Sequence, residues 1–443
     1  MRRLLYLLVL VPVAVSAQSE ALLASQAGPA AADTTRPAAA ADPSPASAET
    51  PAVDTAEELR LTLSGQLRHR TEADYRADGA PGDFHLLRTR LNAQFAPTDD
   101  VVAFVQIQDA RTFGGENPAA GRGTLDGSAP LLDVHQAYFA VADLFDTPLA
   151  VKVGRQELAY GNERLIGSLG WSNVGRTFDA GVARYATDRL AVDVFGARLV
   201  DGLAARSEQN LAGVYGTVGL GAGASLDVFG LYDDDTAEIA AGPAVGASVL
   251  VRGTTGARLF GKTGAVDYDL EGAYQFGRQS RGETLGRAPI SAYLASAEAG
   301  VSVGKGRVSA LYTVLSGDDP ASDTDGAFNT LFATNHKFYG FADLFPFTAA
   351  VRPGGLHDAA LRASYAVAPR TALRLDLHHF RLDRDLGAGT ALGQEVDLTA
   401  TYRYNDALGL VGGVSVFFAA DQIEAVRGKD VLSWLYLSSV VDF

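Results

Sequence analysis

The sequence contains no cysteine, which excludes disulfide scaffolds, cysteine-ligated metal sites and thiol catalysis. It is also poor in charge. Only 20% of the 443 residues are charged, and 52 acidic against 37 basic residues give a formal net charge of −15. This acidic excess argues against nucleic-acid binding, which needs a basic patch to displace counterions from phosphate. Lysine is scarce as well: five of the 37 basic residues are lysine, so 32 (37 − 5) are arginine. A GC-rich genome would explain this bias, and so would a partly desolvated interior that binds anions.

Beyond residue 17 the chain has no long apolar run. No stretch there approaches the ~20 apolar residues that a membrane helix needs. Residues 1–17 (MRRLLYLLVLVPVAVSA) have a basic start, an apolar middle and a small-residue cleavage site, which together predict a secretory signal peptide. Its removal would take away Arg2 and Arg3 and change the formal charge from −15 to −17 (−15 − 2). Residues 18–57 are rich in Ala, Pro, Ser and Thr and lack aromatic residues, which predicts a disordered periplasmic leader.

From about residue 60 onward, apolar and polar residues alternate in long stretches. In one of them Val266, Tyr268 and Leu270 fall on one face of an extended chain, and Asp267 and Asp269 fall on the other. Strands of soluble sandwiches are typically about 5–6 residues long, whereas these stretches reach the roughly 9–11 residues of a tilted membrane strand. Eighteen strands are predicted, at residues 60–75, 84–96, 101–111, 132–142, 149–158, 177–186, 190–200, 211–219, 224–232, 249–260, 265–277, 290–302, 307–315, 356–366, 372–381, 394–404, 408–418 and 431–443.

The connections between these strands alternate in length. Those after even-numbered strands are short, and the longest follow odd-numbered strands, at residues 112–131, 159–176, 233–248, 278–289 and 316–355. Outer-membrane barrels have short periplasmic turns and long extracellular loops. The terminal Phe443 also resembles the recognition signal of such barrels. We therefore predict an all-β fold, a single transmembrane antiparallel β-barrel of about 18 strands over residues 58–443. It is expected in the bacterial outer membrane, with both termini in the periplasm.

A closed barrel of this size is too wide for its side chains to fill, so it leaves an aqueous lumen through which solutes can pass. The inward faces of the first two strands form a basic wall, which the fifth strand is expected to extend. Its members are Arg68, Arg70, Arg88, Arg90, Lys152 and Arg155. The inward face of the eleventh strand is acidic, and strands fourteen to sixteen mix both signs. These charges either act on permeating ions or pair with one another to hold the lumen rigid and wet. The connection 316–355 is the expected constriction.

Three stretches resemble one family at these spacings: VQIQDAR (Val105–Arg111), GRQELAYGNERLIGSLGWSNVGRTFD (Gly154–Asp179) and NHKFYGFADLF (Asn335–Phe345). Together, within this strand count, they resemble the alginate-export family of outer-membrane proteins over about residues 60–443. The resemblance implies an eighteen-stranded barrel that lets an anionic uronate polysaccharide leave the cell passively through an arginine-lined pore, without a cofactor. The acidic walls depart from a uniformly basic pore, so the resemblance does not determine which solute is transported.

The second of these stretches spans the fifth strand, its loop and the start of the sixth strand, so the resemblance also places its arginines at the pore. The full set of candidate pore-lining or anion-binding residues is Arg68, Arg70, Arg88, Arg90, Lys152, Arg155, Arg164, Arg176, Arg362, Arg374 and Arg403. Expected partners are outer-membrane lipids, an anionic polysaccharide, and periplasmic export or barrel-assembly proteins.

Other functions compete with polysaccharide export. The same barrel is consistent with a general or substrate-specific porin for small solutes, or with a structural or adhesive barrel that acts through its long loops. An enzyme is not expected, because none of the seven histidines lies in a recognisable nucleophile motif. His378 and His379 are adjacent on a predicted strand and so face opposite ways, which argues against a shared metal. The acidic residues before Gly326 do not form an EF-hand loop. With Gly326 at position 6, the first calcium-ligand position is Ala321, which has no side-chain oxygen. No catalytic residue, metal or cofactor is therefore predicted.

Overall fold

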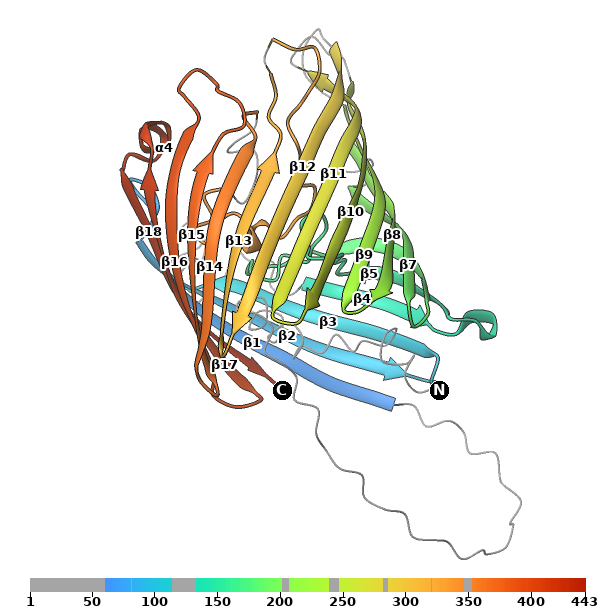
Figure 1. Ribbon diagram of the computed structural model, residues 1–443. Helices are drawn as coiled ribbons and strands as arrows, with labels where there is room; N and C mark the ends of the chain where they lie inside the picture. The colour runs from blue at the N-terminus through green and yellow to red at the C-terminus, as the bar shows by residue number, and fades with distance from the viewer. Residues whose placement is uncertain are drawn as a thin grey trace, which may run out of the picture.

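The computed structural model describes residues 60–80, 82–113, 133–200, 207–238, 247–281, 286–319, 321–345 and 353–443. These residues form one ring of eighteen antiparallel strands, in which each strand pairs with its neighbours in sequence (Figure 1). β1 also pairs with β18, from Gln66 opposite Asp442 to Tyr75 opposite Ser433, and this pairing closes the barrel. Closure leaves no unpaired sheet edge, as lipid requires. The predicted signal peptide and leader lie outside the described residues.

The first nine strands are β1 (Arg60–Tyr75), β2 (Gly82–Ala96), β3 (Val101–Thr112), β4 (Asp133–Val141), β5 (Leu149–Gln156), β6 (Phe178–Ala186), β7 (Leu190–Val200), β8 (Ser207–Gly221) and β9 (Ala224–Glu238). The others are β10 (Ala247–Thr263), β11 (Val266–Arg281), β12 (Gly286–Val303), β13 (Gly306–Leu315), β14 (Leu356–Ala368), β15 (Thr371–Arg381), β16 (Ala391–Arg403), β17 (Leu408–Ala419) and β18 (Val431–Asp442). Within the described ranges, the connections contain three short helices, namely η3 (Leu144–Asp146), η4 (Asn335–Lys337) and α4 (Asp421–Arg427). Among the described residues, no helix is long and apolar enough to cross a membrane.

Every one of the eighteen predicted strands is present, so the predicted fold is confirmed. The main differences are at strand ends. β9 continues to residue 238 and β10 begins at residue 247, because their pairing persists past the predicted limits of 232 and 249. β5 stops at Gln156 instead of continuing to residue 158, because the chain there leaves the wall and enters the lumen.

Burial across the strands is the reverse of burial in a soluble protein. On β1, the side chains of Leu61 and Leu63 are 52% and 70% exposed, whereas Arg68 and Arg70 are only 3% and 4% exposed. The apolar side chains therefore point outward and the charged ones point into the barrel. An outward apolar surface of this kind is stable only against lipid.

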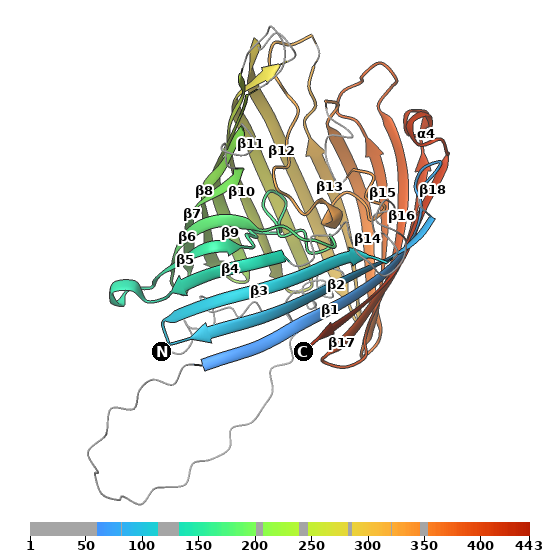
Figure 2. The same ribbon diagram turned by 180° about the vertical axis from the view of Figure 1, so that it is seen from behind.

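Exposed aromatic side chains mark the two ends of this outer apolar surface. Tyr274, Phe276 and Tyr293 lie toward the end that carries α4, and Tyr365 and Tyr402 lie toward the other end. Outer-membrane barrels have such aromatic girdles at both membrane interfaces. The chain enters β1 and leaves β18 at the end opposite α4, as Figures 1 and 2 show. This arrangement agrees with both termini being periplasmic.

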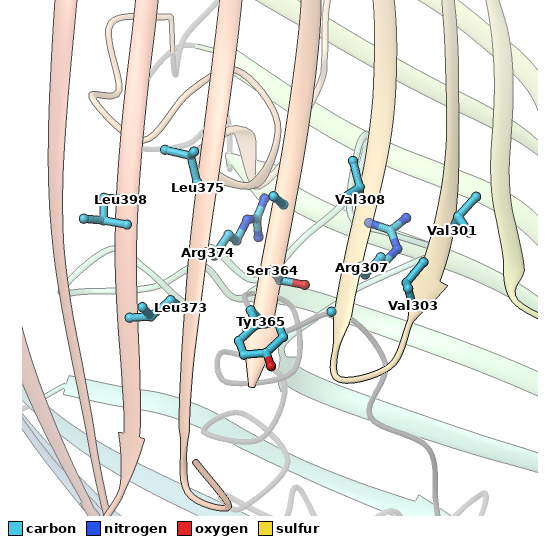
Figure 3. Close-up of a pocket in the computed structure, with 12 residues that line it drawn as sticks. Val301, Val303, Arg307, Val308, Ser364, Tyr365, Leu373, Arg374, Leu375 and Leu398 are labelled. Atoms are coloured by element: carbon cyan, nitrogen blue, oxygen red, sulfur yellow. The ribbon is translucent and has the colours of Figure 1, made fainter. Parts of the chain in front are cut away.

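An apolar groove of about 430 Å³ in the described wall also lies on the outer surface (Figure 3). It runs across β12–β16 near their periplasmic ends, and Val301, Val308, Leu373, Leu375 and Leu398 contribute outward side chains to it. Because these side chains face lipid, the groove is part of the membrane contact and not of a solute path.

Gly154 on β5 shows how tightly neighbouring strands approach one another. Its φ is +130°, and a Cβ at this position would lie 2.2 Å from the carbonyl oxygen of Ala137 on β4. Strain of this kind typically costs ~1–3 kcal/mol. We predict that Gly154→Ala lowers the free energy of unfolding by about this amount, measured by urea titration in liposomes. Gly181→Ala on β6 is the control, because a Cβ there meets nothing within 4 Å. Equal unfolding midpoints for the two variants would contradict the prediction.

Candidate functional site: the lumen and its two inward segments

Of the connections that the structure describes, two fold into the barrel instead of outward. They are the β5–β6 segment (residues 157–177) and the β13–β14 segment (residues 316–355, described at 316–319, 321–345 and 353–355), and Figure 2 shows both inside the ring of strands. They pair with one another through a parallel bridge between Ile166 and Phe332. The Phe332 N–H donates to the Leu165 carbonyl at 2.8 Å, and the Gly167 N–H donates to the Phe332 carbonyl at 2.9 Å. The 316–355 connection, which is expected to form the constriction, is thus joined to the earlier segment inside the barrel.

Glu163 joins the two segments at a second point. The Lys337 ammonium donates to its Oε1 at 2.6 Å, and the Thr334 hydroxyl donates to its Oε2 at 2.5 Å. The Thr334 N–H also donates to the Glu163 carbonyl at 2.9 Å. Because charge-assisted bonds are stronger than neutral ones, this contact stabilises the pairing of the two segments.

Apolar side chains of both segments pack against one part of the inner wall. The Tyr160 ring stacks between Phe195 and Tyr215, with ring centroids 4.9 Å and 5.0 Å away. From the other segment, the Phe345 ring lies 4.9 Å from that of Phe380 on β15. Burial of these rings favours the inward position of both segments, since the hydrophobic effect is proportional to the apolar area removed from water.

The basic wall of β1 and β2 holds the β5–β6 segment by its carbonyl groups. Arg68 and Arg88 lie directly opposite each other across the two strands. Arg68 donates to the carbonyl oxygens of Gly170 and Ser172, both at 2.8 Å. Arg88 donates to the same two oxygens, at 3.4 Å and 3.2 Å. Like charges opposite each other repel, so the two carbonyls stabilise a guanidinium pair that would otherwise be unfavourable.

Arg70 and Arg90 extend this wall and have additional partners. Arg70 donates to the Trp171 carbonyl at 2.7 Å and forms an ion pair with Glu72, also at 2.7 Å. Arg90 donates to Gln108 at 2.7 Å and pairs with Glu157 at 3.3 Å. All four arginines of the wall are buried beneath the segment. Their predicted role in lining an open pore remains a prediction.

Glu157, at the start of the segment, is a second acidic partner of this wall, after Glu72. Burial by itself raises the pKa of its carboxyl, but the hydrogen bond with His135 and the charge of Arg90 outweigh that effect. The pKa of Glu157 therefore lies below its usual value, and the side chain is ionised at neutral pH.

Acidic side chains on β16 hold the β13–β14 segment by its amide groups. The Ala342 N–H donates to Glu395 Oε1 at 2.7 Å, and the Phe341 N–H lies 3.4 Å from Asp397 Oδ2. Gly340 permits this approach, because its φ is +80° and a Cβ there would lie 2.5 Å from Glu395 Oε2. The basic wall therefore binds carbonyls and the acidic wall binds amides.

Most of the remaining lumen charges form ion pairs. The inward acids of β11 each meet an arginine: Asp267 pairs with Arg307, Asp269 pairs with Arg258 at 2.6 Å, and Glu271 pairs with Arg164 at 3.0 Å. This arrangement is the one expected if opposite charges pair to hold the wall rigid and wet.

The other predicted site residues separate into two groups by position. Those inside the lumen are Lys152, Arg164, Arg176, Arg362 and Arg374. Lys152 lies over the Tyr138 ring at 3.9 Å, and Arg176 donates to carbonyls of the β13–β14 segment. Burial lowers the pKa of Arg176 to about 10, which leaves it charged at neutral pH. Arg362 pairs with Glu298 and Arg374 pairs with Asp376, at 3.0 Å and 2.7 Å.

Arg155 and Arg403 lie elsewhere. Arg155 was expected on the inward face with Lys152, but it is on the outer surface, where it pairs with Asp179 at 2.8 Å and both side chains are about half exposed. The physical reason is parity, since residues three positions apart on a strand face opposite ways. Arg403 is exposed at the periplasmic end of β16.

The acidic part of the 316–355 connection uses its carboxylates locally. Asp318 Oδ1 accepts from the Gly326 N–H at 3.1 Å, and Asp325 Oδ1 accepts from the Ala327 N–H at 3.0 Å. Such side-chain bonds stabilise turns in the loop. They give these acids a structural role within the segment.

Sequence reasoning missed the residues that join the segments, namely Glu163, Trp171 and His336. The His336 ring stacks on that of Trp171 at 4.3 Å, and the guanidinium of Arg70 lies 4.1 Å from the same indole ring. Trp171 and His336 belong to stretches that carry the family resemblance, and this resemblance is the one sequence feature that could have pointed to them. Their pairing across 165 residues was not visible in it.

Comparison with known proteins agrees with this architecture. The "Alginate export" family model matches residues 59–431. Among solved structures, Pseudomonas aeruginosa OccK5 (OpdH) is similar with a TM-score of 0.53 and 11% identity, covering 87% of this chain and 99% of that one. OccK3 (OpdO) has a TM-score of 0.56 and 14% identity, covering 86% and 95%. OpdK with vanillate, from the same organism, has a TM-score of 0.54 and 11% identity, covering 86% and 98%. None of the curated proteins compared by sequence matches the chain.

The solved structures are too distant in sequence to show more than the shared barrel fold. The family match, in contrast, covers most of the chain and includes both inward segments. An eighteen-stranded barrel with a polar interior and an apolar outer surface is built for lipid outside and water inside. The chain therefore belongs to the alginate export family, as an integral outer-membrane channel for polar solutes.

Proposed function

We propose that this channel passively passes an anionic polysaccharide along the basic wall of β1 and β2. The observation that carries the proposal is the pair Arg68 and Arg88, whose guanidinium groups converge on the carbonyls of Gly170 and Ser172. Carbonyl oxygens bear only partial negative charge, so they accept hydrogen bonds without neutralising the two arginines. Carboxylates bind guanidinium groups more strongly and often in bidentate geometry.

A uronate carboxylate is therefore expected to compete with the β5–β6 segment for the same arginines. Glu72 and Glu157 are the acids paired with the four arginines of this wall in the described part of the chain. The wall thus keeps a positive excess of two charges (4 − 2). The paired charges around β11 contribute much less to the electrostatic field in the lumen, because each acid is matched by an arginine.

The proposal predicts selective block of the channel by anionic oligosaccharides. In planar bilayers, uronate oligosaccharides are expected to reduce single-channel current at concentrations where neutral oligosaccharides of equal length do not. Arg88→Gln combined with Arg90→Gln is expected to weaken this block several-fold and to move ion selectivity away from anions. Arg155→Gln is the control, because that arginine lies on the outer surface. Unchanged block in the double variant would refute the role of the basic wall.

A second candidate is a substrate-specific porin for small solutes. It is favoured by the apolar packing of both inward segments against the inner wall, which narrows the lumen. One structure with the same fold, OpdK, was solved with vanillate. Oligosaccharide length separates the two candidates: a small-solute porin would be blocked equally by short and long chains, whereas a polysaccharide channel binds long chains more tightly. A barrel without measurable conductance would favour the structural or adhesive alternative.

A further inference from the structure

The acidic wall of the lumen holds more negative charge than its neighbours balance. Asp358 on β14, Asp376 on β15, and Glu395 and Asp397 on β16 are each at most 1% exposed. In the described part of the chain, Arg374 is the one arginine or lysine that forms an ion pair with these four carboxylates, and His378 contacts Asp358 at 2.8 Å. Buried charges without partners are strongly unfavourable, so this wall needs another source of positive charge.

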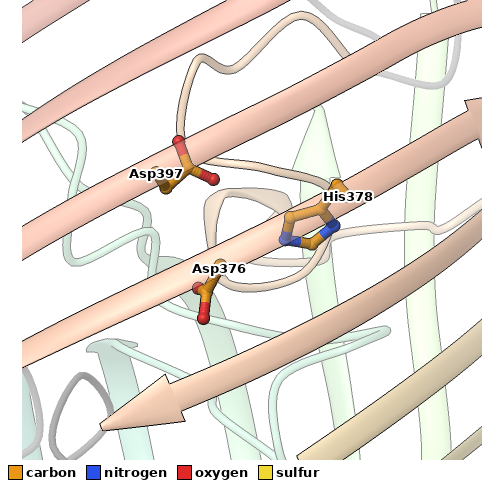
Figure 4. A group of neighbouring side chains, drawn as sticks. All are labelled: Asp376, His378 and Asp397. Atoms are coloured by element: carbon orange, nitrogen blue, oxygen red, sulfur yellow. The ribbon is translucent and has the colours of Figure 1, made fainter.

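Three side chains of this wall are placed to bind a cation that would supply that charge. Asp376, His378 and Asp397 point into one space on the inner wall, as Figure 4 shows, and their candidate ligand atoms all lie within 4.8 Å of one another. Asp376 and Asp397 are directly opposite each other across β15 and β16. Oxygen Oδ1 of Asp397 is buried and has no hydrogen-bond partner.

His378 is held in the orientation that a metal ligand needs. Its Nδ1 lies 2.8 Å from Asp358 Oδ1, and this contact leaves Nε2 as the nitrogen that can bind a cation. Metal-binding histidines commonly donate their other ring N–H to a carboxylate, which fixes the tautomer and raises the basicity of the ligand. The adjacent His379 is exposed on the opposite face of β15, so the sequence argument against a His378–His379 metal pair does not apply to this group.

We propose that Asp376, His378 and Asp397 bind a divalent transition-metal ion, with Zn²⁺ as the best match. Two carboxylate oxygens and one imidazole nitrogen form a three-ligand set that suits Zn²⁺ and leaves a fourth position for water. Ca²⁺ instead prefers 6–8 oxygen ligands. With Zn–ligand bonds of about 2.0–2.2 Å, small side-chain rotations bring the three donor atoms to the required separation. The ion would lie beside Phe341 of the β13–β14 segment, because the Phe341 N–H faces Asp397.

The test is Zn²⁺ binding to the full-length, detergent-folded barrel by isothermal titration calorimetry, with folding of each variant checked by heat-modifiable migration on gels. Wild type is expected to bind one equivalent. His378→Gln is expected to weaken binding by at least tenfold, and His379→Gln is expected to leave it unchanged. Asp358→Asn keeps all three ligands and is expected to weaken binding by roughly 10–100-fold, so it tests the site even if His378→Gln does not fold.

Three results would overturn the proposal. The first is no stoichiometric binding by the wild type, which would mean that protons, shared for example between Glu395 and Asp397, neutralise the wall. The second is equal affinity in the His378→Gln and His379→Gln variants. The third is displacement of Zn²⁺ by an equal concentration of Ca²⁺, which would show an oxygen-dominated site without the histidine.

Discussion

Replacing Arg68 and Arg88 together by alanine is expected to raise the single-channel conductance several-fold. These side chains make four hydrogen bonds to the carbonyls of Gly170 and Ser172, and bonds to charged groups typically contribute ~1.5–3 kcal/mol each. Without them, the β5–β6 segment is held to the basic wall much more weakly, through Arg70 and Arg90. The lumen beside β1 and β2 is then expected to widen, and the measurement is conductance in planar bilayers.

The control for this experiment separates release of the segment from loss of charge. Arg68→Lys with Arg88→Lys keeps both charges but loses the forked geometry of the guanidinium, so an intermediate conductance is expected. Arg155→Ala removes an arginine from the outer surface and is expected to have no effect. Wild-type conductance in the double alanine variant would show that the remaining contacts, through Arg70, Arg90 and the β13–β14 segment, are enough to hold the segment in place.

Leu270→Arg is expected to be the most destabilising of the lipid-facing substitutions. Leu270 lies on the outer face of β11 between Tyr268 and Tyr274, so it is near the middle of the apolar band. An arginine at the bilayer midplane of a barrel costs ~2–4 kcal/mol. The free energy of unfolding in liposomes, from urea or guanidinium titration, should fall by about this amount.

The cost should depend on depth in the membrane. Val303 is also outward and is 73% exposed, but it lies at the periplasmic end of β12. Near the interface the same substitution costs only ~0–1 kcal/mol, so Val303→Arg is the matched control. A similar loss of stability in both variants would contradict the assignment of Leu270 to the centre of the membrane band.

The barrel could be predicted from the sequence because the pattern that indicates it lies within each strand. Alternation along a strand depends only on which way successive side chains point, and a stretch such as 266–276 shows it directly. The same parity rule, applied strictly, would have placed Lys152 and Arg155 on opposite faces. The outward position of Arg155 therefore follows from the sequence itself.

The partners of the lumen charges were beyond sequence reasoning. Arg68 donates to Gly170 across 102 residues, and Arg164 pairs with Glu271 across 107 residues. Neither contact follows from a strand pattern, because it depends on where a connection folds after it leaves the wall. The group of Asp376, His378 and Asp397 likewise depends on the register of β15 against β16.

The sequence by itself determined that this protein is an eighteen-stranded outer-membrane barrel with an arginine-rich inner face, and its resemblance indicated the alginate export family. Only the tertiary structure decided what those arginines touch. Two of the described connections turn inward. Carbonyl groups of one accept hydrogen bonds from wall arginines, and amide groups of the other donate to wall carboxylates. The physical reason is that backbone groups buried between a segment and the wall are removed from water and must be paired. The nearest charged side chains of the wall provide that pairing.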